Sequence, residues 1–255
     1  MSGIRLLYED PWFVAIHKPE GMLVHRSPLD RNETRFALQE ARNLVGRRLF
    51  PLHRLDRPTS GVLLFAADRE AARKGFSLFR EGLVGKIYFA IVRGWISEAG
   101  VIDSPLADDL GGLRMETSAP PRVREAMTEF RRLAAFEVPF AVSKHPTTRY
   151  SLAEIRPLTG RRRQIRRHFK HIFHPLIGDT TYGEGRHNRF FREQFGCFRL
   201  LLAAVRLILP HPFTGERLDI FCPPEESFLR VLRELRNEGT TLPEGNDGPV
   251  QREKE

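Results

Sequence analysis

The apolar runs of this 255-residue chain are short, and their length limits the folds that it can adopt. The two longest candidates, residues 62–67 and 200–205, have the length of buried β-strands. A helix that crosses a bilayer needs roughly 20 apolar residues, so neither run can span a membrane. Residues 1–21 carry charges among their apolar side chains, which excludes an uninterrupted signal sequence. The pattern predicts a folded cytoplasmic protein built around strands.

Strands and helices alternate in the first half of the chain. Residues 4–8 and 12–16 predict two short strands around a turn. Thr34 is placed to cap a helix that ends before Gly46, and Asp68 is placed to cap the next helix. The apolar side chains expected on the inward face of that second helix are Ala72, Phe76, Phe79 and Leu83.

A change of composition at residues 97–124, towards Gly, Pro, Asp and Ser, predicts a loop or hinge between two lobes. A last amphipathic helix is expected to stop at Gly239, and residues 237–255 read as a polar, mobile tail. The strands and the basic helix expected in the second lobe lie at residues 128–133, 149–155, 160–172, 200–209 and 218–221.

The positive charge of the chain is clustered. Its formal net charge is +9, and 35 of its 41 basic residues are Arg. Residues 156–170 contain seven basic side chains and no acidic one. A codon bias could explain the number of Arg residues, but it explains the clustering less well. Because guanidinium groups bind phosphate in a bidentate manner, the cluster favours a nucleic-acid partner over a membrane surface.

Cysteine and histidine spacing gives no metal or disulfide signal. Cys197 and Cys222 are too few for a disulfide framework and lack the paired spacing of a zinc site. His168, His171 and His174 fall at intervals of three, but no matching ligand cluster accompanies them. We therefore expect no metal site at these residues.

The densest chemical pattern is residues 53–61, HRLDRPTSG, directly before a predicted buried strand. Pro58 and Gly61 favour irregular backbone there. Asp56 lies between Arg54 and Arg57, whose positive charges favour the ionised carboxylate. Such a carboxylate can act as a nucleophile or can stabilise a developing sugar cation. In isolation, an Asp between two Arg residues is more often a structural ion pair in a turn than a catalytic group. The choice between these two interpretations depends on the other motifs of the chain.

Residues 53–61 resemble the catalytic signature of the RluA-type pseudouridine synthases, and other segments match that family in order. Residues 17–25 (HKPEGMLVH) are similar to its N-terminal motif, and residues 86–94 (KIYFAIVRG) to the segment with its active-site tyrosine. Residues 159–168 (TGRRRQIRRH) are similar to its arginine-containing helix, and residues 174–183 to the turn that follows. The resemblance implies an α+β fold, with a mixed, largely antiparallel sheet in two lobes and the active site in a cleft between them.

The resemblance also assigns the catalytic residues. It implies that Asp56 acts on the ribose side of a target uridine, by attack on C1′, addition to C6 or removal of a sugar proton. It implies that Tyr88 packs on the uracil ring and assists the proton step at C5. Arg166 would be the ion-pair partner of Asp56, which fits the need of a buried carboxylate for a partner.

Further residues are expected to bind substrate because they flank these three in the motifs or belong to the basic helix. They are His53, Arg54, Leu55, Arg57, Thr59, Ile165, Arg161, Arg162 and Arg163. Ile165 would form an apolar wall of the uridine pocket. Three positions depart from the family pattern: His17 where Asn is common, Arg163 where His is usual, and Ala203 where His is frequent.

The finer matches within the family lie at residues 25–31, 145–150 and 211–216. They are similar to members that act on tRNA at uridine 65. The resemblance thus implies one catalytic domain over residues 1–236, no preceding S4-type RNA-binding domain, a tRNA partner and a monomer. It also implies that no metal or other cofactor is required, because isomerisation neither oxidises the substrate nor transfers a group to a second one. Three alternatives remain: the same reaction on another tRNA or ribosomal uridine, a non-catalytic RNA-binding or chaperone protein, and hydrolysis by Asp56 that releases free uracil.

Overall fold

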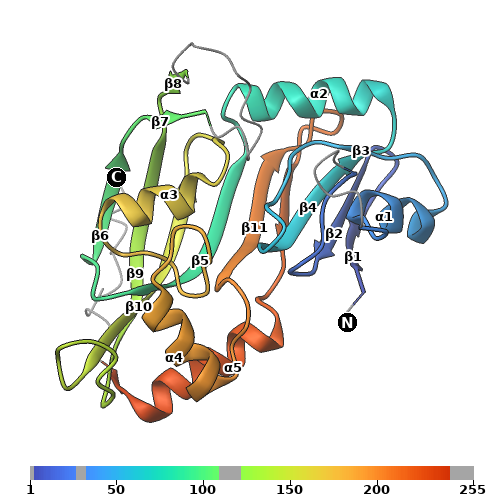
Figure 1. The fold of residues 1–255 in the computed structure, drawn as a ribbon. Coiled ribbons are helices and arrows are strands. Elements are labelled where there is room, and N and C mark those ends of the chain that lie inside the picture. Colours follow the sequence, from blue (N-terminus) through green and yellow to red (C-terminus); the bar gives the residue numbers. More distant parts are fainter. Residues whose placement is uncertain (1–2, 27–32, 109–121, 242–255) are drawn as a thin grey trace, which may run out of the picture.

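A computed structural model describes residues 3–26, 33–108 and 122–241 of the chain. Within those residues an eleven-stranded sheet forms the centre of the molecule (Figure 1). Its strands are β1 (Arg5–Glu9), β2 (Phe13–Lys18), β3 (Phe50–Pro51), β4 (Ser60–Ala66), β5 (Gly85–Arg93), β6 (Ala99–Asp103), β9 (Met127–Val138), β10 (Thr148–Pro157), β11 (Leu202–Pro210), β12 (Arg217–Phe221) and β13 (Thr240–Thr241). β7 (Leu106–Ala107) and β8 (Val123–Arg124) form a separate pair. The helices are α1 (Ala37–Val45), α2 (Arg69–Arg80), α3 (Gln164–His171), α4 (Gly185–Phe195) and α5 (Glu226–Glu238).

The sheet follows the order β1-β2-β4-β11-β5-β10-β9-β13. Among the described strand pairs, only β4 and β11 run parallel, with Ser60 opposite Ala203 and Gly61 opposite Ala204. The two chains approach so closely there that a Cβ on Gly61 would lie 2.1 Å from the carbonyl oxygen of Ala204. Gly61 also has a φ of +120°, which other residues rarely adopt. A glycine is therefore required where the 53–61 motif enters the sheet.

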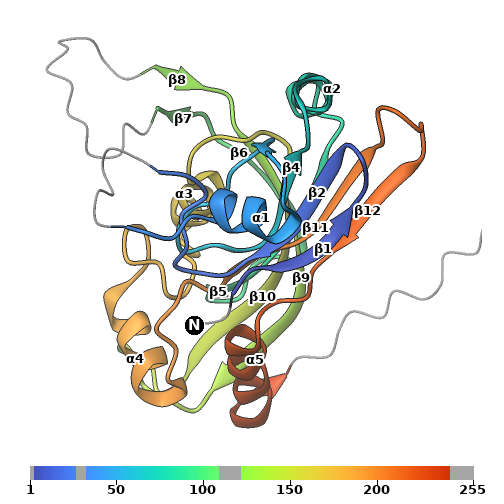
Figure 2. The ribbon, with the colours of Figure 1, turned by 90° about the vertical axis from the view of Figure 1, so that its right-hand side faces the viewer.

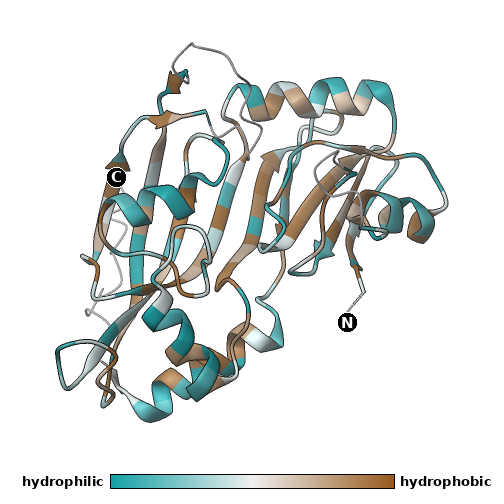
Figure 3. Ribbon diagram, in the orientation of Figure 1, coloured by the Kyte–Doolittle hydropathy of each residue, from teal (hydrophilic) through white to brown (hydrophobic). Residues whose placement is uncertain are grey.

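Helices cover both faces of the sheet, as the alternation of buried side chains in β2 illustrates. Phe13 packs in the cluster under α2, whereas Val14 packs in the cluster under α1 on the opposite face. In the other half, Ala90 of β5 packs with α3, whereas Ile91 packs in the cluster that includes α4 and α5. Figure 2, turned by 90°, places α4 and α5 at the end of the molecule opposite to α2. Figure 3 shows apolar residues along the central strands and hydrophilic residues over much of the helices.

The mixed, largely antiparallel α+β architecture predicted from the sequence is confirmed. Asp68 caps α2 as predicted, since its carboxylate accepts a 2.8 Å hydrogen bond from the Ala71 backbone N–H. Gly46 ends α1 in the left-handed conformation. Thr34, however, does not cap α1, which begins after Phe36 without a side-chain cap.

The predicted inward face of α2 is partly wrong. The helix buries Ala71, Ala72, Gly75 and Leu78. Phe76 and Leu83 are instead half exposed, at 50% and 51%.

The loop expected over residues 97–124 is also partly wrong. β6 lies within that range and pairs with β9, so it extends the sheet. The chain first crosses between the two halves of the sheet where α2 leads into β5, and not at residues 97–124. Residues 109–121 lie outside the described part.

The C-terminal boundary expected at residue 237 falls inside α5, and Thr240 then pairs with Glu137 of β9. Residues 242–255, most of the expected tail, lie outside the described part. Helix α4 has no counterpart in the sequence prediction. Among the described residues, no helix combines the length and apolar character needed to span a membrane.

Candidate active site

The loop that carries Asp56, residues 52–59, is held by buried polar contacts on its scaffold side. The Asp56 carbonyl accepts a 3.0 Å hydrogen bond from the Thr59 N–H, which closes a turn. Nε2 of His53 accepts a 3.0 Å hydrogen bond from the Leu64 N–H of β4. Burial lowers the pKa of His53 to about 3, and Lys86 contributes in the same direction. His53 is therefore a neutral ring that fixes the loop to the sheet.

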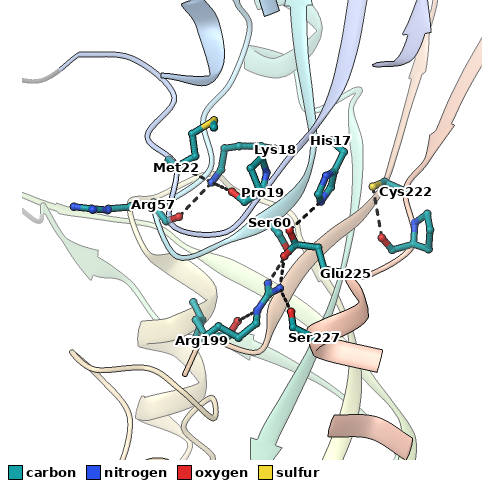
Figure 4. Close-up of polar contacts among 12 residues, drawn as sticks. His17, Lys18, Pro19, Met22, Arg57, Ser60, Arg199, Cys222, Glu225 and Ser227 are labelled. Carbon is teal, nitrogen blue, oxygen red and sulfur yellow. Dashed lines mark hydrogen bonds and ion pairs between the residues drawn. The ribbon is translucent and has the colours of Figure 1, made fainter. Parts of the chain in front are cut away.

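Lys18 holds the backbone of the loop at Arg57, the residue after Asp56. Its side chain is fully buried, and Nζ donates to the backbone carbonyls of Pro19 (2.8 Å), Met22 (2.8 Å) and Arg57 (3.2 Å), as Figure 4 shows. Burial lowers the pKa of Lys18 to about 7. Because one of its acceptors is the carbonyl that follows Asp56, Lys18 positions the loop without contacting the cavity.

Arg199 holds the point where the loop becomes β4. Its guanidinium donates to the Ser60 hydroxyl (2.7 Å), to the Ser227 hydroxyl (3.0 Å) and to the Glu225 carboxylate (Figure 4). Nε2 of His17 lies 3.6 Å from the same carboxylate. The start of α5 is thereby tied to the end of the Asp56 loop.

Asp56 faces Arg166 as the sequence predicts, but Arg166 has a stronger partner. Nη1 of Arg166 lies 3.4 Å from the Asp56 carboxylate. Nε and Nη2 of Arg166 form two 2.7 Å hydrogen bonds with Asp179. Burial opposes the charge of Arg166, but these bonds and the charge of Asp56 together raise its pKa. Asp179 also accepts from the backbone N–H groups of Thr181 and Tyr182, at 2.9 Å each, so its carboxylate is saturated.

Asp179 was not predicted as a site residue, although it lies in a turn motif that the sequence comparison included. Its side chain is 1% exposed, whereas that of Asp56 is 18% exposed. Burial raises the pKa of Asp179, but the hydrogen bonds from Arg166 and from the following backbone outweigh this and lower it. Asp179 therefore orients Arg166, and Asp56 is left accessible to a substrate.

A cavity of about 830 Å³ lies in front of Asp56, on a sheet that is continuous from β4 through β11 to β5. The residues that line it come from the Asp56 loop, from α2 and the strand after it, and from the start of α3. They are His53, Arg54, Leu55, Asp56, Thr59, Phe76, Phe79, Arg80, Gly82, Val84, Lys86, Tyr88, Pro157, Leu158, Thr159, Gly160, Arg161, Arg162, Arg163, Gln164, Ile165, Arg166 and Leu202. Among these described residues Asp56 is the only acidic one, so the cavity suits an anionic polymer that presents one reactive centre to a carboxylate.

Tyr88 of β5 lines the cavity and is protonated. Burial and the nearby Asp56 raise the pKa of its hydroxyl well above the ordinary value. The neutral phenol can donate a hydrogen bond, and its ring can pack against a flat ligand.

The basic segment before α3 forms the opposite wall. The buried Gln164 amide donates to the Met127 carbonyl and the Thr128 hydroxyl, at 2.9 Å each, and its oxygen accepts from the Arg161 N–H at 2.9 Å. The Arg161 guanidinium donates to the Glu125 carbonyl at 2.8 Å. Arg163 has a φ of +55°, an uncommon conformation for a residue with a side chain. These contacts set the course of the backbone in this wall. Gln164 lies in the 159–168 motif but was not predicted as a site residue.

Eleven of the twelve predicted site residues line this cavity, and Arg57 does not. Arg57 points away from the cavity, where it pairs with Glu33 and donates to the Gly21 carbonyl at 3.0 Å. Of the three departures from the family pattern, only Arg163 borders the cavity. His17 faces Glu225, and Ala203 is buried in β11.

The three histidines considered for a metal have separate partners. Nε2 of His168 donates to the Ser104 carbonyl at 3.0 Å, so its other ring nitrogen accepts from the Thr128 hydroxyl at 2.9 Å when the ring is neutral. His174 contacts the Arg93 carbonyl at 2.7 Å, and His171 is exposed. Among the described residues, no group of three or more His, Cys, Asp or Glu is arranged to hold a metal.

The chain matches the family model described as RNA pseudouridylate synthase over residues 12–171. It is 50% identical over 230 residues to tRNA pseudouridine synthase C of Vibrio parahaemolyticus, which covers 90% of this chain and 94% of that protein. It is 45% identical over 230 residues to the enzyme of the same name from Pasteurella multocida, with 90% and 95% coverage.

Solved structures agree with the fold. Human RNA Pseudouridylate Synthase Domain Containing 4 superposes with a TM-score of 0.68 at 26% identity, over 91% of this chain and 92% of that one. Human RNA Pseudouridylate Synthase Domain Containing 1 superposes with a TM-score of 0.71 at 23% identity, over 96% and 92%.

Proposed function

The chain belongs to the RNA pseudouridylate synthase family and is an RNA pseudouridine synthase, and from that premise we propose that it converts uridine to pseudouridine in tRNA, at position 65. The observation that carries the proposal is the arrangement around Asp56. Its carboxylate is the acidic group of an otherwise basic cavity, and Arg166, itself oriented by Asp179, lies 3.4 Å away. The names of the relatives support tRNA as the substrate.

The reaction requires the N1–C1′ bond of uridine to break and a C5–C1′ bond to form. The uracil loses the proton at C5 and gains one at N1, so atoms and charge balance without a second substrate or an oxidant. Asp56 would act on the ribose side of the glycosidic bond, where a carboxylate stabilises developing positive charge. Arg166 would hold that carboxylate in place through the 3.4 Å contact. Tyr88 would pack on the uracil ring that has turned out of its stack, with its hydroxyl as a hydrogen-bond donor.

We also propose that the basic wall formed by Arg161, Arg162 and Arg163 binds the RNA backbone, since it faces the same cavity. Charge reversal at Arg162 would then weaken tRNA binding most at low salt. Equal affinities of wild type and variant across a salt titration would contradict this role. We further propose that the protein is a monomer and acts in the cytoplasm. Two buried cysteines without a disulfide fit a reducing compartment.

The experiment that tests the proposal is tritium release from tRNA labelled at uridine C5, followed by mapping of the modified position. We expect release by the wild type and none by Asp56→Asn, whose thermal unfolding should match that of the wild type. If tritium is released but the modified uridine lies at another position of the tRNA, that position would replace 65 in the proposal.

Release from ribosomal RNA alone would replace tRNA as the substrate. RNA binding without release from any RNA would identify a non-catalytic binder. Free uracil in the products would identify a hydrolase.

A further inference from the structure

The face of α2 that borders the cavity carries aromatic side chains that the helix does not bury. Phe76 is 50% exposed, although its helical spacing predicts an inward position. The reason lies one residue earlier, at Gly75. A Cβ at Gly75 would lie 2.7 Å from the side chain of Leu52, so α2 presses this glycine against the core. Because successive helical residues are about 100° apart, Phe76 is turned outward.

Phe76 and Phe79 both line the cavity, and they differ in what they can still bind. The ring of Phe79 stacks on His53, with centroids 5.1 Å apart and an interplanar angle of 23°. That contact holds Phe79 against the Asp56 loop. Phe76 lies one helical turn away and has half of its surface open. The cavity therefore runs from Asp56 past Phe79 to an exposed aromatic ring.

The size and charge of the cavity indicate what would cover this ring. At about 830 Å³ it lies towards the upper end of the roughly 300–1,000 Å³ range of small-molecule sites, which is more than one nucleotide needs. The lining beside the aromatic rings is basic. Arg80 is exposed on α2, and Lys86 on β5 is partly buried, with Nζ donating to the Thr159 carbonyl at 3.2 Å. Nη2 of Arg80 lies 3.0 Å from the Ser77 hydroxyl and 3.7 Å from Glu81. An aromatic ring beside cationic side chains suits a nucleotide, because the base stacks and the phosphate pairs with the cations.

We propose that Phe76, supported by Phe79, forms a stacking subsite for the base of a nucleotide that flanks the target uridine in the substrate RNA. This inference rests on the proposed function, since the RNA that occupies the subsite is the one whose uridine reaches Asp56. The subsite adds affinity and leaves the chemical step at Asp56 unchanged.

The test uses Phe76→Ala, Phe76→Trp and a control, Phe198→Ala. Phe198 is 82% exposed and does not line the cavity, so its removal deletes an equivalent ring elsewhere. Binding is measured by fluorescence anisotropy with a labelled RNA pentanucleotide that contains one central uridine. Two further probes lack the base on the 5′ or the 3′ side of that uridine. Steady-state kinetics on tRNA supply KM and kcat.

We expect Phe76→Ala to weaken binding of the intact probe about 10-fold and to raise KM for tRNA more than it lowers kcat. Phe76→Trp should restore binding, and Phe198→Ala should leave it unchanged. With one of the two abasic probes, wild type and Phe76→Ala should bind equally, because the stacking partner is gone.

Equal binding of the intact probe by wild type and Phe76→Ala would overturn the inference. So would a loss that stays the same size on both abasic probes, since that loss would not come from a flanking base. A wild type that binds with the expected pattern but forms no pseudouridine in any tRNA would refute the proposed function and leave the subsite standing. An active wild type with an unaffected Phe76→Ala variant would refute the subsite alone.

Discussion

Arg166 and Arg199 are both buried arginines that bind a carboxylate, yet they lie in different regions and serve different purposes. Arg166 divides its guanidinium between Asp179, at 2.7 Å, and Asp56, at 3.4 Å. Arg199 directs its guanidinium to scaffold groups, among them Glu225 and Ser60.

Among the described residues, Arg166 provides the one hydrogen bond found for the Asp56 carboxylate, which therefore keeps acceptor capacity for a substrate. A buried carboxylate whose oxygens all accept hydrogen bonds, such as Asp179, stabilises the structure. A carboxylate that accepts few hydrogen bonds and borders a cavity can still bind a substrate. The same pair of residue types thus ties scaffold elements together in one region and, in the function proposed above, serves the reaction in the other.

Replacing Arg199 should produce the largest change, and it should be a loss of stability. Arg199→Met leaves the Glu225 carboxylate, 14% exposed, without its main partner, which we expect to lower the free energy of unfolding by about 3 kcal/mol. Urea unfolding measures this. The double variant Arg199→Met/Glu225→Leu should regain part of the loss, because no partly buried charge is then left without its partner. A single variant as stable as the wild type would show that the two regions do not differ in this way.

Replacing Arg166 should instead reduce activity. Arg166→Met removes the cation that keeps Asp56 in place, and we expect the rate of tritium release to fall about 100- to 1,000-fold. Arg199→Met, assayed at a temperature where it remains folded, should retain activity within about 10-fold. Similar losses of activity in the two variants would remove the distinction between the regions.

Asp179 should show an intermediate effect that acts through Arg166. Asp179→Asn keeps the shape of the side chain but loses its charge, so we expect kcat to fall about 10-fold with little change in KM. Asp219→Asn is the matched control. Asp219 binds Arg206 in the same two-point manner, at 2.6 and 2.7 Å, on the exposed surface. If both substitutions leave kcat unchanged, Asp179 does not position Arg166.

His53 should give the smallest effect, on the pH dependence of stability. Its pKa is about 3 in the folded protein and about 6.5 when unfolded. The unfolded chain therefore binds more protons between these values, so the stabilisation is complete above pH 6.5 and is lost as the pH falls towards 3. Between pH 6.5 and 5 the wild type should lose on the order of 1 kcal/mol more than His53→Gln, measured by urea unfolding. If the free energies of unfolding of wild type and His53→Gln change equally with pH, His53 does not contribute to the pH dependence of stability.

Local sequence signals predicted most elements but not their packing. The cap at Asp68 and the ends at Gly46 and Gly239 depend on a few neighbouring residues, and the structure places them as expected. The outward position of Phe76 depends on the contact between Gly75 and Leu52, which are far apart in the chain. Helix α4 was not predicted because only two of its three buried side chains, Phe191 and Phe195, are apolar, and the third is His187. Two apolar positions among charged residues are too few to indicate an amphipathic helix.

The sequence by itself determined which groups we propose to take part in the reaction. The motifs around Asp56, Tyr88 and Arg166 specify a carboxylate, a phenol and a guanidinium, and the structure gathers them in one cavity. Only the tertiary structure decided which carboxylates pair with Arg166. Arg166 lies 110 residues from Asp56 and 13 from Asp179, and the sheet brings both carboxylates to it while burying only Asp179 completely. Spacing along a chain sets helix and strand faces, whereas the burial and the free acceptor capacity of a carboxylate depend on every element packed around it.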